Sequence, residues 1–164
     1  MEIDFYIDHL STTDVNHWYS EEFIVSSLVR FLKENGYKIH KDKAVDRSEK
    51  VVIASKYFTK EVIEIKGFPA KAVQTGSSQK STNSTAQAKH WFSDALFSSF
   101  VNFGKYYSNE NAEIAMALPN AERYRAIIEK VQDYFTINNL HFKIYLVNED
   151  GQVEVSNLNE NMRK

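Results

Sequence analysis

The chain has 164 residues, of which 43% are hydrophobic and 13% aromatic, enough for one domain with its own core. The formal net charge is −2, so a nucleic-acid partner would require a local basic patch or metal ions to offset phosphate charge. The lack of cysteine excludes disulfides and thiolate metal sites, and the few glycines and prolines exclude a fibrous or low-complexity protein.

No stretch has the length of a membrane span, and the N-terminus lacks a basic segment followed by an apolar one. We therefore expect a cytoplasmic protein with no membrane partner. Residues 1–164 are expected to form a single α/β domain in which residues 157–164 are a flexible tail.

The first half of the chain predicts one helix and several short strands. A short strand is expected at residues 3–7, and a helix over residues 20–35, where Ser20 is a capping residue and apolar side chains recur at helical spacing. Strands are expected at residues 37–40, 50–55 and 61–66. The connection between the last two is short, which favours an antiparallel hairpin.

The second half alternates helices and strands after a long polar loop over residues 67–84. The capping box Ser84-Thr85-Ala86-Gln87 opens a helix with an apolar stripe that runs to residue 103. A strand over 112–118, a helix capped by Asn120, a strand over 141–147 and an edge strand at 153–155 follow. The strand–helix–strand units predict parallel neighbours, hence a mixed sheet of about five strands flanked by helices in the order αβββαβαβ.

The run Glu64-Ile65-Lys66 is the most informative local pattern. Side chains alternate along a strand, so Glu64 and Lys66 share one face while Ile63 and Ile65 point to the other. A carboxylate beside an ammonium at a strand end can hold a divalent cation and orient a water. The same tripeptide also fits the solvent-facing edge of a half-buried hairpin.

This element order, with Glu-x-Lys on the third strand, resembles the restriction-endonuclease-like superfamily of nucleases. The signature of that superfamily is an acidic residue at the second strand followed by Asp/Glu-x-Lys on the third. The run 62–67, with its apolar lead-in, is similar to the third-strand motif, and Asn35-Gly36-Tyr37 is similar to the end of the first helix in resolvase-type members. The resemblance covers roughly residues 20–120, and it implies a restriction-endonuclease-like core.

The chain departs from the superfamily pattern at the first acidic position, where an ungapped comparison places Val51. The nearest substitutes are Glu49, which shares the face of Val51 if the strand extends back to it, and Asp46, which would need a looped or bulged segment. One fewer acid lowers metal affinity, because hard cations need several oxygen ligands.

The resemblance implies a Mg²⁺- or Mn²⁺-dependent nuclease that cleaves DNA and acts as a homodimer, as many such nucleases do. Glu64 with Glu49 or Asp46 would hold the metal, and Lys66 would orient water and stabilise the transition state. We favour Glu21 over Glu22 as a further carboxylate, since it flanks the buried stripe of its helix, and Gln87 lies where several members carry a catalytic Gln or Lys. Contacts to the DNA backbone are expected from Lys71, Lys80, Lys89 and His90.

Other enzyme classes find little support in the sequence. The five histidines form no zinc-binding pair, and no nucleophile elbow, P-loop or dinucleotide-binding glycine motif occurs. The runner-up hypothesis is a chain with the same fold but without the chemistry, which serves as a DNA-binding or protein-interaction module. The acid missing at Val51 is the direct argument for it.

Overall fold

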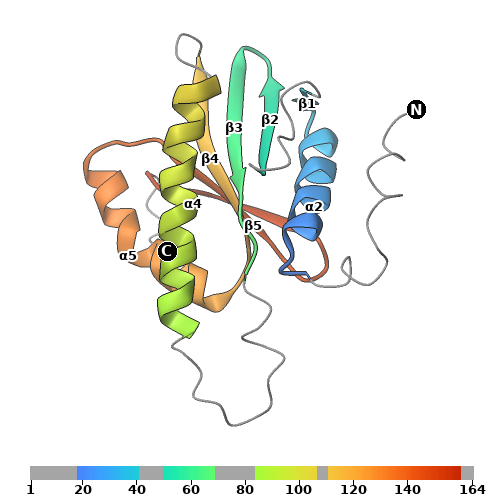
Figure 1. Ribbon diagram of the computed structural model, residues 1–164. Helices are drawn as coiled ribbons and strands as arrows, with labels where there is room; N and C mark the ends of the chain where they lie inside the picture. Colours follow the sequence, from blue (N-terminus) through green and yellow to red (C-terminus); the bar gives the residue numbers. More distant parts are fainter. Residues whose placement is uncertain (1–17, 41–49, 69–83, 107–110, 160–164) are drawn as a thin grey trace.

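The fold is described from a computed structural model, shown in Figure 1. The structure describes residues 18–40, 50–68, 84–106 and 111–159. The expected strand at residues 3–7 and the polar loop beyond residue 68 therefore lie outside the described residues. None of the described helices is long and apolar enough to cross a membrane.

The described residues form three helices and six strands in the predicted order, and the last strand is the edge strand expected at residues 153–155. The helices are α2 (Glu21–Glu34), α4 (Ser84–Tyr106) and α5 (Glu122–Ile137). The strands are β1 (Lys38–Ile39), β2 (Val51–Lys56), β3 (Thr59–Ile65), β4 (Ala112–Pro119), β5 (Lys143–Val147) and β6 (Val153–Asn157). The α/β class and the alternation of elements are confirmed, with six strands in place of about five.

All six strands join one mixed sheet in sequence order, β1 to β6. The predicted hairpin is confirmed, because β2 and β3 pair antiparallel with Val51 opposite Glu64. The predicted parallel neighbours are also confirmed, since β3, β4 and β5 run parallel to one another. The carboxyl ends of β3, β4 and β5 therefore lie at the same edge of the sheet.

The helices cover the two faces of the sheet, with α2 on one face and α4 and α5 on the other (Figure 1). Strand β4 shows how the sequence produces both layers. Ala115 and Ala117 pack against α2, whereas the alternate residues Met116 and Leu118 pack against α4 and α5. A strand covered on both faces needs a continuous apolar run, which this segment supplies.

Two sequence predictions need local correction. Asn120 does not cap α5, because the N-cap residue is Ala121, which makes no side-chain cap bond. The side-chain amide of Asn120 instead donates to Glu154 and accepts from Arg125. The predicted tail starts too early, because β6 includes Asn157 and Leu158 is fully buried. Long-range partners, which local sequence does not reveal, decide both positions.

Strand β3 carries a buried carboxylate, Glu61, on the α2 face of the sheet, where it is 2% exposed. It accepts hydrogen bonds from the hydroxyls of Tyr37 (3.0 Å) and Tyr145, and it pairs with Lys143 (2.5 Å). Buried carboxylates are stable only when their oxygens have such donors. This cluster links the end of α2 to the centre of the sheet.

The cluster changes the titration of its members. Burial, followed by the charge of Glu61 and its hydrogen bond, raises the pKa of the Tyr145 hydroxyl. Burial works to lower the pKa of Lys143, but the hydrogen bond and ion pair with Glu61 outweigh it and raise the pKa. The folded chain therefore holds both protons more tightly than an unfolded chain would.

Replacing Tyr145 by Phe should destabilise the fold, because it removes a donor from a buried carboxylate. The expected loss is about 1.5–3 kcal/mol, or a fall in Tm of roughly 3–10 °C for a domain of this size. Thermal unfolding followed by circular dichroism measures the shift. The control is Tyr134→Phe, which removes the hydroxyl of a tyrosine that is 63% exposed, and it should stay within about 0.5 kcal/mol of the wild type. Equal Tm values for the two variants would contradict a stabilising role for the cluster.

The same cluster predicts a loss of stability at alkaline pH. The raised folded-state pKa of Tyr145 stabilises the folded chain. This contribution is fully present below the unfolded-state pKa, about 10 for tyrosine, and is lost as the pH rises toward the folded-state pKa. The stability advantage of the wild type over Tyr145→Phe should therefore shrink by roughly 1 kcal/mol between pH 9 and pH 11. Urea titrations at several pH values measure it. A constant or growing advantage would show that Tyr145 is not held protonated.

Candidate functional site

The Glu64-Ile65-Lys66 motif lies at the carboxyl end of β3, where its side chains alternate as predicted. Ile63 and Ile65 pack in the core under α2, whereas Glu64 and Lys66 contact residues of α4. The prediction that Glu64 and Lys66 share one face is therefore confirmed. The hypothesis of a solvent-facing edge is wrong for Glu64, which is only 7% exposed.

One partner of Glu64 is Asn102, on the sheet-facing side of α4. The amide Nδ2 of Asn102 donates to Oε2 of Glu64 at 2.7 Å. Asn102 is 3% exposed, and its carbonyl Oδ1 is buried with no hydrogen-bond partner. Most buried polar atoms in proteins are satisfied, so this oxygen marks the site as chemically unusual.

Lys66 lies between two side chains of α4. Its ammonium forms an ion pair with Asp94 and lies 5.4 Å from the centre of the Trp91 ring. The Lys66 side chain is 23% exposed and that of Asp94 is 46% exposed, so the pair lies at the surface end of the site. Helix α4 therefore supplies a partner for each of the two charged residues of the motif.

Val51 is the direct cross-strand neighbour of Glu64 and is 2% exposed. It packs with Val62 and Phe103 on the α4 side of the sheet, the side on which Glu64 lies. The position expected to carry the first acid of the superfamily therefore faces Glu64 but bears an apolar side chain. The two proposed substitutes, Glu49 and Asp46, lie outside the described residues.

Glu21 lies at the start of α2, where it forms an ion pair with Lys50 and not with the Glu64-Ile65-Lys66 motif. The Lys50 ammonium contacts Glu21 at 2.7 Å and Glu22 at 2.6 Å, so the two acids are equivalent in this pairing. Burial works to raise the pKa of Glu22, but its hydrogen bonds and the charge of Lys50 lower it overall. Since Lys50 precedes Val51 in the strand, its side chain points to the opposite face.

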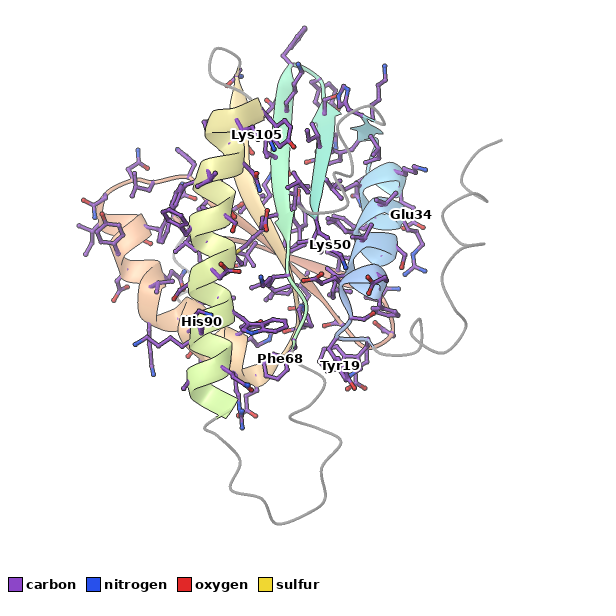
Figure 2. All side chains as sticks on the ribbon, viewed as in Figure 1. Tyr19, Glu34, Lys50, Phe68, His90 and Lys105 are labelled. Carbon is purple, nitrogen blue, oxygen red and sulfur yellow. The ribbon has the colours of Figure 1, made fainter. Side chains whose placement is uncertain are left out.

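The chain just after the motif is held close to the start of α2. The Phe68 amide donates to the Tyr19 carbonyl at 2.9 Å, and the Tyr124 hydroxyl donates to the Gly67 carbonyl at 2.8 Å. A Cβ at Gly67 would lie 2.7 Å from the Tyr19 carbonyl oxygen, so glycine is needed for this approach. Figure 2 shows Tyr19 and Phe68 at one end of the sheet and Lys105 at the other.

Three of the other predicted site residues lie on the first turns of α4. Gln87, Lys89 and His90 are all exposed, on the part of the helix that precedes Trp91 and Asp94 (Figure 2 labels His90). They are therefore accessible to a ligand at this end of the sheet. Lys71 and Lys80 lie outside the described residues.

The site offers few protein ligands for a divalent cation. Within residues 18–40, 50–68, 84–106 and 111–159, no group of three His, Cys, Asp or Glu side chains is arranged to hold a metal ion. The site does offer the Glu64 carboxylate and, on the amide that donates to it, the unpaired carbonyl oxygen of Asn102. Both are hard oxygen ligands, and Mg²⁺ is commonly bound by one or two protein carboxylates with water and substrate phosphate as further ligands.

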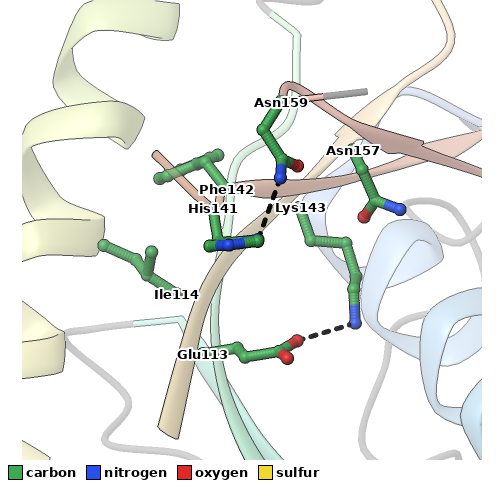
Figure 3. Close-up of a pocket in the computed structure, with 7 residues that line it drawn as sticks. All are labelled: Glu113, Ile114, His141, Phe142, Lys143, Asn157 and Asn159. Carbon is green, nitrogen blue, oxygen red and sulfur yellow. Dashed lines mark hydrogen bonds and ion pairs between the residues drawn. The ribbon is translucent and has the colours of Figure 1, made fainter. Parts of the chain in front are cut away.

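A polar hollow lies at the opposite edge of the sheet, where β4 and β5 begin (Figure 3). Its volume is about 220 Å³. Glu113 pairs there with Lys143 at 3.1 Å, and Asn159 bonds to Nδ1 of His141 at 2.9 Å. Its charged groups are thus already paired with each other, and it lies apart from the motif.

Sequence reasoning missed Asp94 and Asn102 as partners of the motif. For Asn102 a signal existed, because it continues the helical spacing of the buried residues Ala88, Ala95 and Ser99. A polar residue at a buried position predicts a buried polar partner. Asp94 has no comparable signal, since an exposed acid on a helix is common.

Comparison of the chain with protein families, with curated proteins and with solved structures found no match. The resemblance to restriction-endonuclease-like nucleases therefore depends on the Glu-x-Lys motif and on the order of helices and strands.

Proposed function

We propose that the protein is a metal-dependent DNA endonuclease with a restriction-endonuclease-like core, which hydrolyses phosphodiester bonds. The observation that carries the proposal is that Glu64 and Lys66 share the α4 face at the carboxyl end of β3. Ligand sites in α/β proteins commonly lie at that edge of the sheet. The element order supports the same proposal, because it follows the core expected for this superfamily.

In this mechanism Glu64 holds the cation, with Asn102 fixing the orientation of its carboxylate. A bound Mg²⁺ or Mn²⁺ supplies a water of lowered pKa and neutralises charge that builds up on the phosphate. The low exposure of Glu64 restricts bulk water around the carboxylate, which strengthens its interaction with any cation.

Lys66 contributes positive charge and hydrogen-bond donors. The ion pair with Asp94 and the contact with Trp91 hold its ammonium on the α4 side of the sheet. From there it can orient the attacking water and stabilise negative charge on the phosphate in the transition state. Asp94 holds the Lys66 ammonium in position until a phosphate competes for it.

A second candidate function is favoured by Val51. The apolar side chain opposite Glu64 removes one expected ligand, so a chain of this fold could bind DNA without cleaving it. Exposed Lys89 and His90 would then contact phosphates. The two candidates differ in whether Glu64 is needed for a chemical step.

The test is cleavage of plasmid and linear DNA in Mg²⁺ or Mn²⁺ by the wild type and by Glu64→Gln and Lys66→Met. Each substitution should reduce the rate by at least about 10²-fold, because each removes a group that acts on the reacting phosphate. Glu129→Gln and Lys130→Met are matched controls on the exposed side of α5 and should cleave like the wild type. Circular dichroism checks that all variants are folded.

Undiminished cleavage by the folded Glu64→Gln variant would overturn the nuclease proposal. A wild type that never cleaves but shifts DNA with an affinity that falls as salt rises would support the binding module instead. A wild type that does neither would exclude both candidates.

A further inference from the structure

The unpaired carbonyl of Asn102 is the feature that the proposed chemistry leaves unexplained. Oδ1 is buried on the sheet-facing side of α4 and accepts no hydrogen bond, while Nδ2 of the same amide donates to Glu64 at 2.7 Å. Burial of an oxygen acceptor without a donor costs stability. The amide that contacts the Glu64 carboxylate therefore carries an oxygen acceptor without a donor.

The chemistry of this point favours a cation. The Glu64 carboxylate and the Asn102 amide are in direct contact at a buried position, and the amide carries a carbonyl oxygen that has no donor. Carboxylate, amide carbonyl and water oxygens are the ligands of Mg²⁺, Mn²⁺ and Ca²⁺ in proteins. Val51, on the neighbouring strand, contributes no oxygen from its side chain.

We propose that Asn102 is a direct ligand of a divalent cation bound at Glu64, supplying from helix α4 the oxygen that Val51 does not supply from β2. An amide presents Nδ2 or Oδ1 to the same neighbour after half a turn about its Cβ–Cγ bond. Asn102 thus donates to Glu64 when no cation is present and offers its carbonyl oxygen when a cation is bound.

Other polar groups of α4 on the described elements are already engaged. Ser99, one turn before Asn102 and fully buried, donates to the Ala95 carbonyl at 2.7 Å. Asp94 is paired with Lys66. Asn102 is the residue that combines contact with Glu64 and an oxygen without a partner.

The inference rests on the proposed function for its location, since the cation is the one that the nuclease would use. Its test measures binding of Mn²⁺ alone, without DNA or turnover. Electron paramagnetic resonance of free Mn²⁺ gives the dissociation constant for the wild type and for Asn102→Leu, Asn102→Asp and Ser99→Ala.

Asn102→Leu keeps the approximate size of the side chain but removes its oxygen, so Mn²⁺ binding should weaken at least tenfold. Asn102→Asp cannot donate to Glu64 when ionised but can bind a cation, so it should bind Mn²⁺ at least as tightly as the wild type. Ser99→Ala is the matched control, because it removes a buried polar group from the same helix that does not contact Glu64, and its affinity should equal that of the wild type.

Equal Mn²⁺ affinity for Asn102→Leu and the wild type would overturn the proposal. If Asn102→Asp binds Mn²⁺ as weakly as Asn102→Leu does, the amide acts only as a donor that positions Glu64, and the ligand role is wrong.

The inference and the proposed function can fail independently of each other. Metal-dependent cleavage that requires Glu64 but tolerates Asn102→Leu refutes the inference alone. Mn²⁺ binding that requires Asn102, in a chain that never cleaves, refutes the nuclease alone.

Discussion

The structure depends on how one strand accommodates two buried carboxylates. Strand β3 carries Glu61 on the α2 face of the sheet and Glu64 on the α4 face, and both are almost inaccessible to solvent. A buried carboxylate destabilises a fold unless donors or cations surround it. The two faces meet this requirement differently. Glu61 stabilises the fold, whereas Glu64 is proposed to act on a substrate.

Glu61 is surrounded by two tyrosine hydroxyls and a lysine, which satisfy its oxygens and join α2, β3 and β5. Glu64 instead accepts a hydrogen bond from the Asn102 amide, whose carbonyl oxygen has no donor. A buried acceptor without a donor is unfavourable for a purely structural site. It is the arrangement expected where a cation completes the site, which is why the chemistry is proposed at Glu64 and not at Glu61.

Much of this arrangement could be predicted from the sequence. Period-two alternation predicted that Glu64 and Lys66 face one way and Ile63 and Ile65 the other, and helical spacing predicted the buried side of α2. The sequence could not predict that Asn102 lies against Glu64, since 38 residues separate them and only the packing of α4 on β3 brings them together. The role of Asn120 was mispredicted for a similar reason, because its partner Glu154 is 34 residues away and reaches it only in the folded chain.

The most direct measurement of the central claim is a crystal structure of the chain soaked in Mn²⁺, whose anomalous signal locates the ion without reference to activity. The account predicts a Mn²⁺ ion bound to a carboxylate oxygen of Glu64, with the amide of Asn102 turned so that its carbonyl faces the ion. Mn²⁺ bound elsewhere, with Glu64 still accepting its hydrogen bond from Asn102 and no ion beside it, would contradict the account.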